Sequence, residues 1–239
     1  MNDRPARRCV KAVVPTGLWE VGDPFVIRQT VMTVPRDQHV GDRTGMVRLA
    51  RILSNIISPP IMFALLGLAL GVHERSIWPG LGWGIVYGLL IALIPMLVIL
   101  YLLRIGRVSE LHMSATNERH IPYVTSVITG TLAYAILVFF DGPILLRCLA
   151  ILSVITLGTL GLINTQWLIS IHATAAAATW MIATLVFGWI TGLILLPLLV
   201  LIASIRLYLK RHTPAQVLAG IALGFSTVLL MRAFGCFVS

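Results

Sequence analysis

Between Ala173 and Ile205 the chain runs for 33 residues without a charged side chain. A helix that crosses a membrane needs about 20 apolar residues, so this stretch is too long for one ordinary helix. Gly188, Gly192 and Pro197 lie inside it and favour a tight turn followed by a kinked returning helix. The chain is therefore predicted to cross a membrane more than once.

Apolar segments of spanning length continue from Ile52 to the end of the chain. With 58% hydrophobic and 11% charged residues among 239, the chain has too few polar side chains for an ordinary soluble domain. Charged and turn residues separate seven predicted spans, with six as the alternative. These spans are 54–72, 82–103, 122–140, 144–163, 172–189, 190–205 and 214–232. We therefore predict an all-α, polytopic transmembrane helix bundle, with residues 52–239 as one domain.

Residues 1–51 form a segment of different composition. They hold nine of the 18 Lys and Arg residues and five of the nine Asp and Glu residues. Pro and Gly are scattered through them, and they lack the apolar core of a cleavable signal peptide. We predict a poorly ordered basic tail. Met46, which opens a compact basic approach to the first span, is an alternative start of the chain.

The formal net charge of +9 lies in this tail and in short loops, without interleaved aromatic residues. That distribution favours membrane topology over nucleic-acid binding. The bias of Lys and Arg in the short loops places the tail, the 104–121 loop and the 206–212 loop in the cytoplasm. A prokaryotic-type plasma membrane is the predicted location, and the N-terminus and any site on these loops are predicted to be cytoplasmic.

Two other residue types give weaker signals. Cys9, Cys148 and Cys236 are far apart and lack metal-ligand spacing, so neither a disulfide framework nor a zinc site is predicted. Tyr123, like several tryptophans, lies near a predicted span end, where an aromatic belt is expected.

Three polar segments are predicted to meet at one end of the bundle. Arg119 lies in the 104–121 loop, Ser170 and His172 precede one span, and Arg206 and His212 precede the last span. Because two crossings separate each segment from the next, all three share a face. Phosphoryl transfer needs a nucleophile, a proton donor and positive charge around the phosphate oxygens, and these residues supply all three.

Helix ends add to this prediction. Ser170 and Thr213 are good N-cap residues, so two helix N-termini would direct N–H groups and positive dipole ends toward a shared anion site.

The motifs resemble those of the type 2 phosphatidic acid phosphatase and haloperoxidase superfamily. Residues 204–216 read SIRLYLKRHTPAQ, which is similar to the third signature of that family, serine-arginine, five residues, histidine, three residues, aspartate. Residues 169–172 read ISIH and resemble the second signature, proline-serine-glycine-histidine. The first signature, lysine, six residues, arginine-proline, is matched by His112 and Arg119, with Pro122 displaced.

The resemblance implies a membrane phosphatase with its active site at the membrane interface. His212 would attack phosphorus and form a phosphohistidine, and His172 would protonate the leaving group and then activate water. Arg119, Arg206, Ser170 and His112 would bind the phosphoryl oxygens. The substrate would be a lipid phosphate or a polyprenyl diphosphate, and neither a metal nor another cofactor is required.

Gln216 occupies the position of the family's orienting carboxylate. No Asp or Glu follows Asp141, so a substitute carboxylate could come only from Glu110, from Glu118 or from the tail. This departure supports an alternative function, a catalytically impaired member that serves as a structural or assembly subunit among membrane-protein partners. A transporter is a third, more distant hypothesis.

Each site residue also has a simpler interpretation. Thr213 and Gln216 match a capping box with proline at the first helical position. His212, flanked by Lys210 and Arg211, could face anionic lipid, and His172 could form an interhelical hydrogen bond. The small pair Gly220 and Gly224 suits close helix packing.

Overall fold

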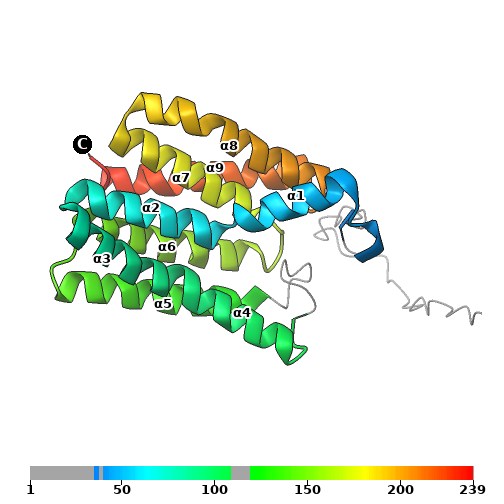
Figure 1. The fold of residues 1–239 in the computed structure, drawn as a ribbon, viewed down its shortest axis with the longest axis horizontal. Helices are drawn as coiled ribbons and strands as arrows, with labels where there is room; N and C mark the ends of the chain where they lie inside the picture. The colour runs from blue at the N-terminus through cyan, green and yellow to red at the C-terminus, as the bar shows by residue number, and fades with distance from the viewer. Residues whose placement is uncertain (1–34, 38–39, 109–118, 239) are drawn as a thin grey trace, which may run out of the picture. The chain divides into compact units, whose positions relative to one another are not determined.

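The computed structural model describes residues 35–37, 40–108 and 119–238. In these residues all regular secondary structure is helical (Figure 1). The elements are the turn Val40–Asp42, α1 (Gly45–Ile56), α2 (Pro59–Glu74), α3 (Ile77–Gly88), the π-helical stretch Leu89–Leu93, α4 (Ile94–Arg104), α5 (His120–Phe139), α6 (Ile144–Ile163), α7 (Ile171–Phe187), α8 (Trp189–Tyr208) and α9 (Pro214–Ala233).

Helices of spanning length confirm the predicted all-α transmembrane bundle. Among the described residues, five helices are long and apolar enough to cross a membrane: Ile77–Arg104, α5, α6, α8 and α9. The pair α1 and α2, bent by 44°, raises this number to six if it forms one span. The shorter apolar helix α7 lies at the fifth predicted span, 172–189. Every predicted span therefore contains a helix.

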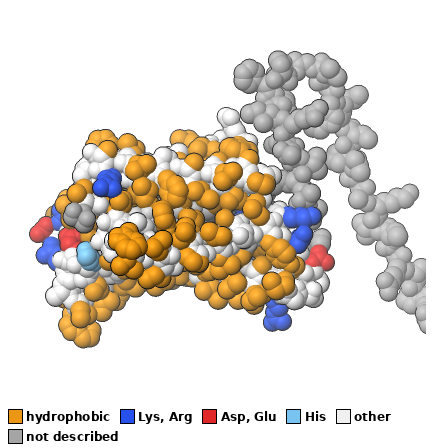
Figure 2. All heavy atoms as spheres, turned by 90° about the horizontal axis from the view of Figure 1, so that it is seen from above, with side chains coloured by type: hydrophobic (Ala, Val, Ile, Leu, Met, Phe, Trp, Pro, Cys, Tyr) orange, Lys and Arg blue, Asp and Glu red, His pale blue; other side chains and the backbone are white. Residues whose placement is uncertain are grey.

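The outer surface of the bundle suits a lipid environment. Large hydrophobic side chains are exposed along several helices, including Leu65, Ile128 and Ile194. Figure 2 shows hydrophobic side chains over the middle of one face, with charged side chains gathered toward the two ends. This distribution is the one expected of a multi-pass membrane protein.

Proline residues lie at two irregular places in the helices, a bend between α1 and α2 and a π-helical stretch before α4. Pro59 and Pro60 begin α2 directly after Ser58, and the chain bends there. Pro95 follows the π-helical stretch 89–93. Proline has no backbone N–H, and its ring displaces the carbonyl four residues earlier, so the wider π turn accommodates it within a continuous helix. The first helix begins at Gly45, inside the segment predicted as a tail.

Helix α7 is buried along most of its length and packs against α9, α8 and α2. Its small residues, Ala173 and Ala175–Ala178, let α9 approach closely. A Cβ atom on Gly220 would lie 2.7 Å from the Ser170 carbonyl oxygen, and one on Gly224 would overlap the Thr174 carbonyl oxygen. The packing interpretation of these two glycines is confirmed.

A glycine turn divides the 33-residue uncharged stretch, as predicted. Gly188 has a φ of 92°, and the chain reverses there from α7 into α8. Trp180 Nε1 donates a hydrogen bond of 2.8 Å to the Gly192 carbonyl oxygen and fixes the two helices at the turn. Pro197 lies inside α8.

A disulfide corrects the prediction made from the cysteines. Cys148, in the first turns of α6, is bonded to Cys236, which follows α9. The separation of 88 residues gave no spacing signal in the sequence. The bond depends on α6 and α9 packing side by side with these two ends together, which only the tertiary structure determines.

Candidate functional site

A cavity of about 180 Å³ opens inside the bundle. Its walls come from α1, α2, the π-helical stretch, α4, α5, α6 and α7, and Arg206 and His212 complete it. Most of the lining is apolar, with side chains such as Phe63, Ile91 and Met96 on one wall, and several hydroxyl groups also reach it. The described lining contains two arginines and no Asp or Glu, so its formal charge is positive.

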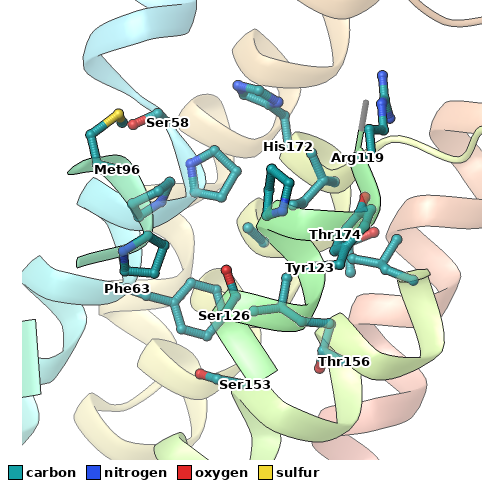
Figure 3. A pocket seen from close by; sticks show the side chains of 18 of the residues that line it. Ser58, Phe63, Met96, Arg119, Tyr123, Ser126, Ser153, Thr156, His172 and Thr174 are labelled. Atoms are coloured by element: carbon teal, nitrogen blue, oxygen red, sulfur yellow. The ribbon is translucent and has the colours of Figure 1, made fainter. Parts of the chain in front are cut away.

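Four predicted site residues meet at one end of this cavity. Arg119 precedes α5, His172 lies in the first turn of α7, Arg206 lies in the last turn of α8, and His212 lies between α8 and α9. They are 8%, 8%, 2% and 6% exposed, respectively. Figure 3 shows His172 and Arg119 at the opposite end of the pocket from Ser153. The predicted convergence of the three segments is confirmed.

Two capped helix N-termini lie next to these side chains. Ser170 Oγ accepts from the Ala173 N–H at 3.3 Å and caps α7. Thr213 and Gln216 form a complete capping box at α9. The Ser170 N–H donates to the Gln216 carbonyl oxygen at 3.2 Å and ties the two helix starts together. Their positive dipole ends therefore favour an anion at this end of the bundle.

His212 is held neutral by its surroundings. Its burial, and then the charges of Arg206 and Arg119, hold its pKa well below the usual range. Its Nδ1 lies 3.3 Å from the Leu168 carbonyl oxygen. Because a carbonyl only accepts hydrogen bonds, Nδ1 carries the proton and Nε2 keeps its lone pair. A neutral imidazole with a free Nε2 lone pair can act as a nucleophile.

The two arginines of the cavity contact neighbouring polar groups. Arg206 Nη1 donates to Ser54 Oγ, in α1, at 3.1 Å. Arg119 lies close to Tyr123, whose hydroxyl accepts from Asn164 Nδ2 at 2.7 Å. These contacts fix the guanidinium groups at the cavity.

Hydroxyl groups line the inner part of the cavity. Ser153 Oγ donates to the Leu149 carbonyl oxygen and pairs with the Tyr87 hydroxyl at 3.2 Å. Thr156 is 3% exposed, and its Oγ1 has no hydrogen-bond partner among the described residues. The inner cavity therefore combines an apolar wall with polar groups that could contact a ligand.

Two predicted site residues, Ser170 and Gln216, are described by the structure and do not line the cavity. Ser170 is fully buried at the α7 cap, and Gln216 is engaged in the α9 capping box. Gln216 Oε1 accepts from the Thr213 N–H at 2.9 Å. Burial lowers the pKa of His212, and the Gln216 side chain offsets a small part of that lowering. His112 lies outside the described residues.

The lipid-facing interpretation of His212 does not agree with the structure. Arg211 is 6% exposed and pairs with Asp37, with Nε 2.9 Å from Oδ1. His212 itself is buried and faces the cavity. The capping-box interpretation of Thr213 and Gln216 is confirmed.

Sequence reasoning missed several groups at this end of the bundle. Ser54 and Asn164 carry no motif, and their contacts come from distant segments. Tyr123 is 9% exposed beside the cavity, so its assignment to an aromatic belt is wrong. Asp37 lies in the segment predicted as a poorly ordered tail, which was one of the possible sources of a substitute carboxylate, but no motif singled it out.

In the part of the chain that the structure describes, no three His, Cys, Asp or Glu side chains form a group that could hold a metal ion. Comparison with protein-family models, with curated proteins and with solved structures finds no match for the chain.

Proposed function

We propose that this chain is an integral membrane phosphatase that hydrolyses a lipid phosphate or a polyprenyl diphosphate through a phosphohistidine at His212. One observation carries the proposal: Arg119, His172, Arg206 and His212 converge, buried, on one cavity. The resemblance of residues 169–172 and 204–216 to the phosphatidic acid phosphatase signatures supports the same chemistry.

In the proposed reaction, Nε2 of neutral His212 attacks phosphorus, and the bond from phosphorus to the leaving oxygen breaks. His172 donates a proton to that oxygen. Water then attacks the phosphohistidine and gives its proton to His172, and the P–N bond breaks to release inorganic phosphate. Both histidines return to their starting states. Arg119 and Arg206 stabilise the charge on the phosphoryl oxygens in each step.

The shape of the cavity favours an amphiphilic substrate. Its cationic end lies at the helix termini, where a head group would meet the membrane surface. From Arg119 to Ser126 the cavity follows α5 for about 10 Å, at 1.5 Å per residue, and the apolar side chains along this path suit the first part of a lipid chain.

Phosphate release by purified full-length protein tests the proposal. The substrates are a diacylglycerol phosphate and a polyprenyl diphosphate in detergent micelles, with EDTA present. We expect His212→Ala to abolish turnover, because it removes the nucleophile. His172→Ala should slow turnover by about 10²–10⁴-fold through loss of the proton donor.

His120→Ala is the matched control, because His120 is exposed at the same end of the bundle and does not line the cavity. Acid-labile phosphate on the peptide that contains His212 would identify the intermediate. Normal turnover by folded His212→Ala protein would exclude the mechanism.

A second candidate function is a catalytically impaired subunit that assembles with other membrane proteins. The observation that favours it is Gln216, whose side chain is engaged in the capping box at the position of the family's carboxylate. Wild-type protein that binds both phosphorylated lipids but releases no phosphate from either would favour this alternative.

The disulfide and the distribution of charge support a cytoplasmic site in a prokaryotic-type plasma membrane. Cys148 and Cys236 lie near the start of α6 and beyond the end of α9. His212 precedes α9, so about 30 Å of helix separates it from that end. Disulfides persist in oxidising compartments, and short-loop Lys and Arg residues favour the cytoplasm. Both observations support a cavity on the cytoplasmic side.

Single cysteines in a cysteine-free background test this orientation. Gln166 and Trp78 are exposed at opposite ends of the bundle. A membrane-impermeant maleimide should label Trp78→Cys in intact cells, and Gln166→Cys only after permeabilisation. The reverse pattern would place the cavity outside the cytoplasm.

A further inference from the structure

Asp37 is a carboxylate buried at the cavity end of the bundle, far in sequence from the motifs. The Arg211 guanidinium donates to both carboxylate oxygens, from Nε to Oδ1 and from Nη2 to Oδ2, each at 2.9 Å. Arg51, in α1, donates to Oδ2 at 2.9 Å. The Asp37 side chain is 0% exposed. Three segments thus meet at one acidic group.

The backbone of this segment is also anchored. The Asp37 carbonyl oxygen accepts from Arg51 Nη1 at 2.9 Å and from Arg43 Nε at 3.0 Å. The Arg36 N–H donates to the Leu209 carbonyl oxygen at 3.1 Å. Residues 36–37 are therefore attached both to α1 and to the turn that follows α8.

That turn carries His212. Lys210 adopts a φ of 53°, and the Arg211 N–H donates to the Arg206 carbonyl oxygen at 3.1 Å. His212 follows directly, with Nδ1 near the Leu168 carbonyl oxygen. Because Arg211 and His212 are adjacent in sequence, a change in the position of Arg211 would also move His212.

We propose that Asp37 is a positioning residue for His212, acting through its bidentate pair with Arg211. It supplies, from the segment before the first membrane helix, a carboxylate that the sequence after Asp141 lacks. It acts on the loop rather than on the imidazole itself. The catalytic part of this inference rests on the proposed phosphatase function, whereas the positioning of His212 is measurable without it.

The physical basis is the burial of the pair. A bidentate arginine–carboxylate contact fixes both distance and orientation. Loss of the carboxylate would leave the Arg211 guanidinium buried without that counter-charge, and the turn would open toward water. His212 would then lose both its orientation and its shielding from solvent.

The test compares Asp37→Asn with Asp42→Asn in full-length protein. Asp42 lies in the same segment but is exposed, so it controls for the removal of an acidic group. Reaction of the neutral imidazole with diethyl pyrocarbonate is followed on the peptide that contains His212. We expect several-fold faster modification of His212 in Asp37→Asn and wild-type rates in Asp42→Asn.

Turnover provides a second readout. Asp37→Asn should lower kcat by tenfold or more and leave KM nearly unchanged, because the nucleophile is misplaced while the arginines still bind phosphate. Asp37→Glu should recover part of the loss. If the wild-type protein has no phosphatase activity, the proposed function fails, but the His212 modification rates still decide the positioning role.

Arg211→Lys keeps the positive charge, loses the bidentate contact, and serves if Asp37→Asn does not fold. Its His212 should also be modified faster than in the wild type. Wild-type modification rates in folded Asp37→Asn, or in folded Arg211→Lys if only that variant folds, would overturn the proposal.

Discussion

The two ends of the helix bundle use charged residues in different ways. At the end away from the cavity, Glu74 accepts from the Ile144 and Leu145 N–H groups at 2.6 and 2.7 Å and caps α6. Asp141, in the turn before α6, pairs with Arg147 in the first turn of that helix. At the cavity end, Arg119 and Arg206 are buried beside two histidines.

At the far end the charged side chains stabilise the protein's own helix ends and turns, whereas at the cavity end the buried arginines line a cavity that could hold a ligand. The acidic groups of the far end complete helix termini and turns within the protein, and the exposure of Asp141 gives its ion pair little weight. Positive charge concentrated in a buried lining is costly in an apolar environment and is suited to an anionic ligand. The cavity end therefore suits an anionic ligand, which agrees with the proposed phosphate site.

Among the tests of this comparison between the two ends, the largest expected effect comes from removing one arginine at each end. Arg206→Gln should reduce kcat/KM for phosphate release by about 10²–10³-fold, the usual effect of removing one group that stabilises transition-state charge. Arg147→Gln should leave kcat/KM unchanged and cost at most about 1 kcal/mol of stability. Equal losses of activity in both variants would show that the two ends are not functionally distinct.

Removal of the disulfide should affect stability alone. A variant with Cys148→Ser and Cys236→Ser should lose about 2–4 kcal/mol in the free energy of unfolding, and its turnover should remain that of the wild type. Thermal unfolding in detergent, with Cys9→Ser as the control, provides the measurement. Lost turnover in a folded variant would reveal coupling between the two ends.

A charge added next to His212 should produce the smallest effect, a shift in pH dependence. Gln216→Glu retains a residue type that completes a capping box and places a carboxylate near the imidazole. Because burial lowers the pKa of His212, the wild type should keep its neutral nucleophile below pH 6.5, about the ordinary value for histidine.

The added carboxylate should raise the pKa of His212, so the acid limb of the kcat/KM profile should move to higher pH in Gln216→Glu. The pH profiles of the two proteins are compared on the same substrate. An unchanged acid limb would mean that Gln216 serves only as a cap, or that His212 does not control the limb.

Much of the cavity end could be predicted from the sequence because its motifs lie next to helix starts. Ser170, Thr213 and Gln216 form local caps that depend on neighbouring residues, and their prediction is confirmed. The convergence of Arg119, His172 and the segment of residues 206–212 followed from the number of spans between them. The catalytic roles of these residues stay predictions.

The remaining contacts could not be predicted, because they join segments with no common pattern. Asp37 meets Arg211 across 174 residues, and nothing in either local sequence indicates the pair. The Leu168 carbonyl oxygen orients His212. Every residue has a backbone carbonyl, so no residue type in the sequence marks this contact.

The sequence by itself determined where the chain forms apolar helices, how those helices begin, and which polar segments lie at the same end. These properties depend on hydrophobic length and on hydrogen bonds within a few residues. Only the tertiary structure decided that Cys148 bonds to Cys236, that Asp37 holds Arg211, and that hydroxyl groups line a cavity. Those contacts depend on how closely helices distant in sequence pack, which small residues such as Gly220 permit but do not specify.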